Sequence, residues 1–172
     1  MRLIILGAGG YGQTVADLAQ QSGRYEEIFF LDDQKQAAEV LGTCDEFQNF
    51  INEETEMYPA FGNNAGRINW LDRLQEAGGS IPTLIHRTAY VSPRATIEKG
   101  TMILPGAIVN TDCVVKRGCI INCGSVVDHG CILEEGVHVC LNTVIKAENR
   151  IPRWMKIEAG EVIPLRTYPV GE

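Results

Sequence analysis

The sequence predicts two domains: a small α/β domain over residues 1–86 and a parallel β-helix over residues 87–172. In the first half, short apolar runs alternate with segments of helical periodicity, which is typical of a parallel sheet with crossover helices. In the second half, a branched aliphatic residue stands at every sixth position. A fixed short period indicates a solenoid, and a period of six indicates a parallel β-helix.

The first strand and helix are predicted within residues 2–22. An apolar run at residues 2–6 ends in the sequence GAGGYG at residues 7–12, and apolar residues then recur at helical spacing up to Gly23. The glycine pattern G-x-G-x-x-G between a strand and a helix is the fingerprint of a dinucleotide-binding turn. The first domain is therefore predicted to be Rossmann-like.

The rest of this domain continues the alternation of strands and helices. Asp32 and Asp33 close the second strand, and Gly78 stops the second long helix. The pattern predicts a parallel sheet of about four strands. The expected elements are strands at 28–31, 57–61 and 83–85 and helices at 46–51 and 67–76.

The second half follows its six-residue unit without a slip. Glycine often occupies the fourth position, where a turn needs a permissive backbone. Three units close one triangular coil, so residues 18 apart stack at about 4.8 Å in about four coils. Trp154 and Arg166 replace the turn glycine, but the aliphatic persists, so we expect the solenoid to continue or to cap itself there. The aliphatics are Val91, Ile97, Ile103, Val109, Val115, Ile121, Val127, Leu133, Val139, Ile145, Ile151, Ile157 and Ile163.

The six cysteines invite a disulfide or metal interpretation, but their spacing argues against both. Cys113, Cys119 and Cys131 each stand four residues after a repeat aliphatic, a position also occupied by Ala95, Thr101, Ala107, Ser125 and Thr143. This position needs a small side chain, and a free cysteine behaves as a small hydrophobe. No CxxC pair is present. We expect core cysteines and no metal site; Cys113 and Cys131 should stack, and a reducing compartment disfavours a bridge between them.

Composition excludes several classes of function. The formal net charge is −7, which argues against a nucleic-acid-binding surface. No apolar run approaches the roughly 20 residues that span a bilayer, and no cationic leader precedes the first strand. These features predict a soluble cytoplasmic protein.

Polar residues at the ends of the predicted strands suggest a nucleotide site. Gly7, Gly9, Gly10 and Gly12 would let phosphate approach the helix N-terminus, and Asp32 and Asp33 lie about 20 residues on, where an acid contacts a ribose or base. A domain of this size has more room for one nucleotide than for two. Asn63 and Arg67 suit a diphosphate, although Asn63 is equally suited to cap a helix.

Among the histidines, His129 is the best candidate for a catalytic base. It occupies an outward position of the repeat that the core does not require, and an imidazole with a pKa near ~6.5 accepts protons at neutral pH. His138 lies half a coil further on and suits substrate binding, reached around the prism or from a second copy. His86 stands at the domain junction and is expected to be structural. The histidine spacings of 43 and 9 exclude the three-histidine zinc site of β-helix carbonic anhydrases.

Six segments, in their order and spacing, resemble the bacterial sugar acyltransferases related to sialic acid O-acetyltransferase and the UDP-4-amino-sugar N-acetyltransferases. The segments are LIILGAGGYG (3–12), FLDD (30–33), FGNN (61–64), LIHRTA (84–89), IINCGSVVDH (120–129) and GVHV (136–139).

This resemblance implies a left-handed β-helix that forms a homotrimer, with acetyl-CoA in the groove between two subunits. The first domain would bind the nucleotide of an activated sugar, most simply a UDP-sugar. His129 would be the general base. Asn122 would line the site, His138 would lie near the acetyl group, and Asp128 is counted with the residues around acceptor and acetyl-CoA.

The resulting hypothesis is acetyl-CoA-dependent acylation of an amino or hydroxyl group on a nucleotide-linked sugar, in bacterial surface-glycan biosynthesis. An alternative is a non-catalytic trimeric scaffold that binds a nucleotide sugar and has lost CoA binding. Gly130, which follows the histidine where the family carries an acid or amide, and the few coils after Ile151 motivate it. A third alternative, an NAD-dependent dehydrogenase, rests on the glycine fingerprint alone.

Overall fold

The computed structural model describes residues 1–171, which form two compact units. The first unit is Met1–Pro82 and the second begins at Thr83. Within the described residues, no helix has the length and apolar character needed to cross a bilayer.

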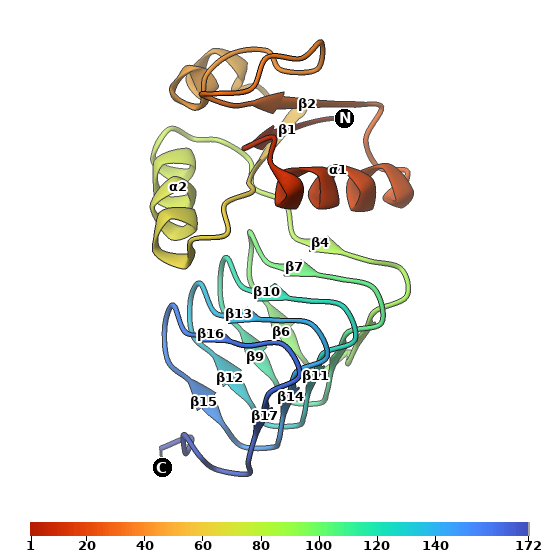
Figure 1. The fold of residues 1–172 in the computed structure, drawn as a ribbon, viewed down its shortest axis with the longest axis vertical. Helices are drawn as coiled ribbons and strands as arrows, with labels where there is room; N and C mark the ends of the chain where they lie inside the picture. The colour runs from red at the N-terminus through yellow and green to blue at the C-terminus, as the bar shows by residue number, and fades with distance from the viewer. Residues whose placement is uncertain (172) are drawn as a thin grey trace. The chain divides into compact units, whose positions relative to one another are not determined.

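The first unit is a three-stranded parallel sheet with helices against it (Figure 1). The strand order is β2-β1-β3, and Leu3 of the central strand pairs with Ile28 on one side and Glu56 on the other. The elements are β1 (Arg2–Leu6), α1 (Gly10–Ser22), β2 (Glu27–Leu31), the 3-10 helix η1 (Cys44–Phe50), β3 (Thr55–Pro59) and α2 (Asn64–Glu76).

Alternation along β1 distributes the core of this unit over both faces of the sheet. Ile4 and Leu6 pack with Phe47 of η1 and Leu74 of α2. The intervening residues of β1 point to the opposite face, because successive side chains of a strand alternate, and they too are fully buried. Helix α1 contacts β1 and β2. From Leu3 to Leu6 the central strand is therefore apolar, as strands buried on both faces are.

The structure confirms one expectation for this unit and contradicts another. The segment expected to be helical at 46–51 is the 3-10 helix η1, which begins at a capping box between Thr43 and Glu46. The strand expected at 83–85 is β4 (Leu84–Ile85), which pairs with β7 in the β-helix and not with the sheet of the first unit. The physical reason is phase: Ile85 stands six residues before Val91, so the repeat begins one unit earlier than the sequence analysis placed it.

The second unit is a β-helix of parallel two-residue strands in three sheets, seen as stacked triangular coils in Figure 1. Sheet 1 has the order β16-β13-β10-β7-β4, sheet 2 has β17-β14-β11-β8-β5, and sheet 3 has β15-β12-β9-β6. The bounds after β4 are β5 (Tyr90–Val91), β6 (Thr96–Ile97), β7 (Met102–Ile103), β8 (Ile108–Val109), β9 (Val114–Val115), β10 (Ile120–Ile121), β11 (Val126–Val127), β12 (Ile132–Leu133), β13 (His138–Val139), β14 (Val144–Ile145), β15 (Arg150–Ile151), β16 (Lys156–Ile157) and β17 (Val162–Ile163).

The second residue of each strand points inward and the first points outward. The inward aliphatics form one continuous core, with Cys113, Cys119 and Cys131 among them. These cysteines are free thiols that donate to backbone carbonyls, as Cys113 does to Asp128 O at 3.0 Å. The predicted core role of these cysteines agrees with their positions in the structure.

The turn glycines adopt the left-handed backbone predicted for the fourth position, with φ between 65° and 73°. Trp154 and Arg166 follow the same path with φ of 62° and 53°. An L residue in this region is strained relative to glycine, yet the coil keeps its course. As predicted, the solenoid continues beyond Trp154, through β16 and β17, and β17 before Arg166 is its last strand within residues 1–171.

Asn149 ends one column of the stack. It occupies the small-residue position below Cys113 and Cys131 and is fully buried. Its amide donates to the carbonyls of Lys146 and Pro164, each at 2.8 Å, and its Oδ1 accepts from Tyr168 N at 2.9 Å. Asn149 thus satisfies polar groups that a further coil would otherwise meet.

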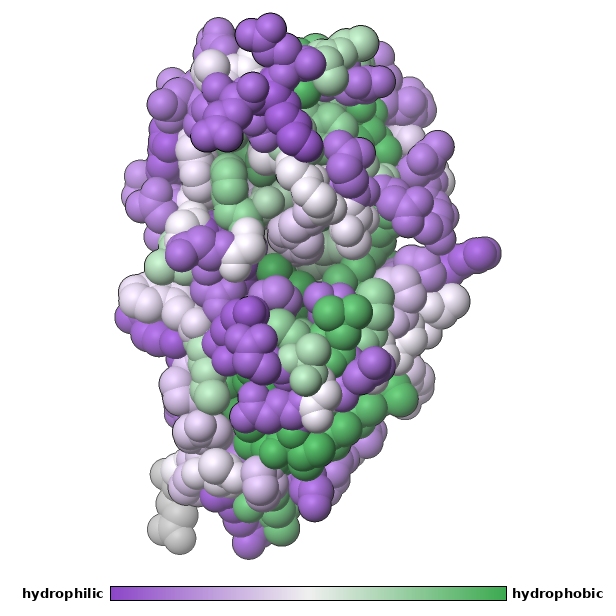
Figure 2. All heavy atoms as spheres, in the orientation of Figure 1, coloured by the Kyte–Doolittle hydropathy of each residue, from purple (hydrophilic) through white to green (hydrophobic). Residues whose placement is uncertain are grey.

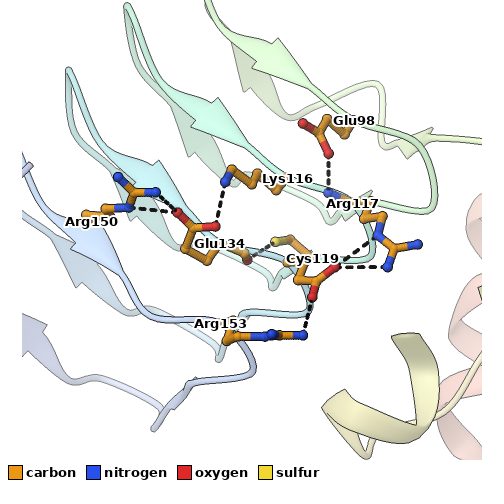
Figure 3. A network of polar contacts seen from close by, with 8 residues as sticks. Glu98, Lys116, Arg117, Cys119, Glu134, Arg150 and Arg153 are labelled. Carbon is orange, nitrogen blue, oxygen red and sulfur yellow. Dashed lines mark hydrogen bonds and ion pairs between the residues drawn. The ribbon is translucent and has the colours of Figure 1, made fainter. Parts of the chain in front are cut away.

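A ladder of ion pairs follows the corner that leads from sheet 3 to sheet 1 (Figure 3). Glu134 accepts from Lys116 at 2.6 Å and from Arg150 at 2.6 Å. One residue further on, the partly buried Glu135 pairs with two arginines, Arg117 at 3.0 Å and Arg153 at 2.6 Å. Each acid therefore bridges the coil before it and the coil after it.

Candidate active site

The glycine turn after β1 is shaped by steric contacts on one side and open on the other. Gly7 has φ +99°, and a Cβ on Gly12 would stand 2.0 Å from the Gly7 carbonyl oxygen. By contrast, nothing lies within 4 Å of a Cβ on Gly9 or Gly10. Gly9 is the N-cap of α1 and makes no side-chain cap hydrogen bond. The first N–H groups of a helix lack intrahelical partners, so this open side suits an anion.

Asp32 holds this turn in place. Its Oδ2 accepts from Ala8 N at 2.7 Å, and its Oδ1 accepts from Gln34 N at 2.9 Å and Lys35 N at 2.8 Å. Burial alone would raise the pKa of the Asp32 carboxyl, but these backbone hydrogen bonds together bring it below the ordinary value. The carboxylate therefore joins the glycine turn to the loop that follows β2.

Asp33 is also engaged within the protein. Its Oδ1 accepts from Cys44 N at 2.8 Å, at the start of η1. Burial, with the charges of Asp33 and Asp32, raises the pKa of the Cys44 thiol to about 12. Cys44 is consequently a neutral core thiol at physiological pH.

Asn63 and Arg67 both serve helix α2 and the loop before it. Asn63 Oδ1 accepts from Gly66 N at 2.7 Å, which is the capping role. Arg67 is 0% exposed and donates to Phe61 O and to Asn64 Oδ1, each at 2.9 Å. The guanidinium is thus enclosed by the protein.

A pocket of about 270 Å³ lies beside the end of β2. Lys35 enters it from the loop after Asp32, and its Nζ donates to Ala8 O in the glycine turn at 2.6 Å. The pocket is large enough for one base or one sugar and adjoins the turn through this contact. Its lining is Asp32, Asp33, Gln34, Lys35, Gln36, Ala37, Val40, Leu41, Gly42, Thr43 and Glu46.

His129 is exposed at the corner between sheet 2 and sheet 3. Asp128 Oδ1 accepts from His129 N at 2.8 Å and from Asn110 Nδ2 at 3.3 Å. The carboxylate therefore fixes the backbone at His129 and does not touch its ring. Within residues 1–171, no side chain hydrogen-bonds the His129 imidazole, and the residue is exposed.

Asn122 and His138 lie on another part of the prism. His138 opens β13 on the outer side of sheet 1 and pairs in register with Ile120 of β10. Asn122 follows β10 at the corner between sheets 1 and 2, where its Oδ1 accepts from Cys123 N at 2.8 Å. Strand β11 and its flanking turn separate Asn122 from His129. One chain brings Asn122 and His138 near each other and leaves His129 one side of the prism away.

Comparison with known proteins supports a family assignment. A model of the PglD N-terminal domain family matches residues 2–74. The acetyltransferase domain of PglB from Neisseria gonorrhoeae superposes with a TM-score of 0.90 at 35% sequence identity, over 94% of this chain and 81% of that one. The chain belongs to the hexapeptide-repeat sugar acetyltransferases.

Two further solved structures are similar to this chain. The PglB domain in complex with acetyl coenzyme A has a TM-score of 0.89 at 35% identity, over 94% of this chain and 80% of that one. PerB from Caulobacter crescentus, in complex with CoA and GDP-perosamine, has a TM-score of 0.77 at 22% identity, over 98% of this chain and 91% of that one. The likeness to PerB extends to the fold alone.

Seen as a family member, the chain holds one candidate that the sequence analysis missed. Lys35 contacts the glycine turn. The one sequence feature that could have indicated this role is that Lys35 is the single lysine or arginine between Arg24 and Arg67.

The structure also bears on metal binding. Nowhere in the described part of the chain do three histidine, cysteine, aspartate or glutamate side chains gather in a way that could hold a metal ion.

Proposed function

We propose that this protein transfers an acetyl group from acetyl-CoA to an amino or hydroxyl group of a nucleotide-activated sugar, in the biosynthesis of a bacterial surface glycan. The observation that carries the proposal is the 35% identity and TM-score of 0.89 to an acetyltransferase domain in complex with acetyl coenzyme A. The open glycine turn and the exposed His129 supply the two chemical functions that such a reaction needs.

Each unit has its own task in this proposal. The first is a Rossmann-like nucleotide-binding domain, in which the diphosphate lies at Gly9 and Gly10 and the base or ribose enters the pocket beside β2. The second is a left-handed β-helix that binds acetyl-CoA and places the acceptor group beside His129. The resemblance to the UDP-4-amino-sugar N-acetyltransferases favours a UDP-sugar as the substrate.

The chemistry is direct acyl transfer. His129 accepts a proton from the acceptor nitrogen or oxygen as that atom bonds to the acetyl carbonyl carbon. The carbon–sulfur bond then breaks, and His129 returns the proton to the sulfur, which releases CoA as the free thiol. No covalent intermediate with the protein is needed, because two substrates held in line react within one site.

We propose that the site is completed by a second copy in a homotrimer. The outward side of sheet 2 is an apolar row in which Tyr90, Ile108 and Val162 are 54%, 36% and 51% exposed, with Val126 and Val144 between them. Figure 2 shows a band of hydrophobic surface across the β-helix. In a trimeric ring that associates through this row, the corner between sheets 2 and 3 of one copy lies against the corner between sheets 1 and 2 of the next copy. His129 of one copy then faces Asn122 and His138 of its neighbour.

Co-expression of two inactive variants tests this arrangement. His129→Ala and His138→Ala should each lower kcat in acetyl transfer from acetyl-CoA to a UDP-4-amino-sugar, by about 10²- to 10⁴-fold for His129, the usual contribution of a general base. When the two variants assort at random, about one quarter of all sites in the trimer population are restored. The readout is acetylated product per trimer, measured by mass spectrometry.

Outcomes of this experiment separate the parts of the proposal. Activity of the mixture no higher than that of the single variants would contradict a shared site. Nearly full activity of His129→Ala alone would remove His129 from the mechanism. His129→Ala should retain the wild-type melting temperature, because its imidazole is exposed at a corner of the prism. Folding of His138→Ala is checked by circular dichroism, because both ring nitrogens of His138 are buried.

One observation favours a second function, a trimeric scaffold that binds a nucleotide sugar without acylating it. The ring of His129 has no hydrogen-bonding side chain within residues 1–171, and Gly130 follows it, so no carboxylate of the same chain orients this base. Calorimetry distinguishes the two functions. Binding of UDP without binding of CoA supports the scaffold, whereas binding of both supports the enzyme.

A further inference from the structure

The pocket beside β2 has an unfavourable charge for the ligand proposed to enter it. Asp32, Asp33 and Glu46 line it with three carboxylates, and Lys35 is the one cation among its lining residues. A nucleoside diphosphate brings further negative charge to the same place. Like charges at short range oppose binding, so a cation has to accompany the phosphates.

The two arginines that flank this stretch of sequence are committed elsewhere. Arg67 is 0% exposed and donates to Phe61 O and Asn64 Oδ1. Arg24 forms an ion pair with the buried Glu56. Moving either group would leave buried polar atoms without partners, which is costly. Lys35 has no such commitment, because its side chain is exposed and its ammonium contacts a backbone carbonyl oxygen.

Lys35 is also placed at the right point. Its Nζ lies 2.6 Å from Ala8 O, in the turn whose next residues, Gly9 and Gly10, present the open N-terminus of α1. Its backbone N–H is held by Asp32, the same carboxylate that holds Ala8 N. The base of the side chain is therefore fixed against the turn, while its four-carbon stem leaves the ammonium able to swing.

We propose that Lys35 is the diphosphate-binding cation of this domain, and that an entering nucleotide exchanges the Lys35–Ala8 hydrogen bond for bonds to phosphate oxygens. This assignment rests on the proposed function, since it presupposes a nucleotide at the glycine turn. It moves the role that the sequence analysis gave to Arg67 onto Lys35. The ammonium serves in binding and positioning and does not take part in acyl transfer.

Three substitutions separate charge from hydrogen bonding at Lys35. Lys35→Met removes both, Lys35→Gln keeps an N–H donor without charge, and Lys35→Arg keeps the charge. Calorimetry with UDP and uridine, and with GDP and guanosine, reports the phosphate contribution for either base. Lys99→Met, an exposed lysine of the β-helix, is the matched control.

We expect Lys35→Met and Lys35→Gln to bind the diphosphate that the wild type binds about tenfold more weakly, and to bind the nucleoside unchanged. Lys35→Arg and Lys99→Met should resemble the wild type. Equal losses for nucleoside and diphosphate, or wild-type affinity in Lys35→Gln, would overturn the assignment and leave Lys35 a purely structural contact of the turn. If the wild type bound neither UDP nor GDP, the nucleotide-binding function itself would fall, and the role of Lys35 with it.

Discussion

At Gly12 the backbone of helix α1 passes so close to the glycine turn after β1 that a methyl group has no room. A Cβ there would stand 2.0 Å from a backbone carbonyl oxygen that cannot move aside easily. We expect Gly12→Ala to lower the free energy of unfolding of the first unit by about 1–3 kcal/mol or more, the usual cost of overpacking. Urea denaturation followed by circular dichroism measures this change.

Gly10→Ala, two residues earlier in the same helix, is the control for this prediction. Its Cβ would meet nothing within 4 Å, and alanine is a better helix former than glycine by up to about 1 kcal/mol. Equal destabilisation by both substitutions would mean that the loss comes from the helix and not from its contact with the Gly7 carbonyl.

The sequence predicted the positions of single residues well where local geometry decides them. The glycine pattern and the acid after the second strand are examples, since strand, turn and helix fix their positions. The burial of Arg67 could not be predicted, because it depends on the carbonyl of Phe61 and on neighbours brought in by the tertiary fold. For the same reason, the contact between Lys35 and Ala8, 27 residues apart, left no local pattern.

At the scale of the elements, the stability that the corner between sheets 3 and 1 contributes depends on pH. Burial raises the pKa of Glu134, but the hydrogen bonds and charges of Lys116 and Arg150 lower it by more than burial raises it. The pKa of this carboxyl therefore lies below its ordinary value. A carboxyl with a lowered folded pKa stabilises the fold above its unfolded pKa, near ~4.3, and this contribution is lost as pH falls through the folded pKa.

Glu134→Gln should therefore destabilise the β-helix at neutral pH and lose that effect in acid. We expect a cost of about 1–2 kcal/mol at pH 7, between that of an exposed and a buried pair, and a smaller difference from the wild type below pH ~4. Thermal unfolding at a series of pH values measures it. Glu158→Gln, which removes only the exposed pair with Lys156, should change little at any pH; a constant deficit of Glu134→Gln down to acid pH would contradict the role of its charge.

The period of six predicted every strand of the β-helix from Val91 onward, because inward aliphatics and left-handed turns are local requirements. It failed at Ile85, where an in-phase residue was assigned to the preceding sheet. A single two-residue strand carries too little pattern to reveal its partner. The 3-10 character of η1 was missed for a related reason, since helix type depends on hydrogen-bond spacing within one or two turns.

For the molecule as a whole, the apolar row on sheet 2 predicts that copies of the protein associate through this row. Ile108→Glu would place a charge within the proposed contact between copies, where desolvating it is costly. We expect a monomer by light scattering and loss of acetyl transfer, with the coils still folded. Thr96→Glu, at the equivalent outward position of sheet 3, should remain a trimer with full activity. A trimer in the Ile108→Glu variant would show that copies meet through another side.

Association and handedness are also the properties that the residues alone could not supply. The spacing of the aliphatics is the same for a left-handed and a right-handed coil. An exposed apolar row indicates that another surface covers it, but it does not identify that surface. Both expectations came from the resemblance of six short segments, which extends to residues such as Asn122 that no periodicity would select.

Val127, Ile145 and Ile163 repeat at intervals of one full turn of chain. An insertion or deletion in the β-helix therefore changes which side of the prism each later residue occupies, unless its length is a whole number of turns. Loss or gain of six residues would turn everything downstream by a third of a revolution and carry the imidazole at position 129, or its partners, to the wrong flank. Only insertions or deletions of a multiple of eighteen residues keep every residue on its original side of the prism. The number of turns can therefore vary between relatives, whereas the direction in which each side chain points cannot.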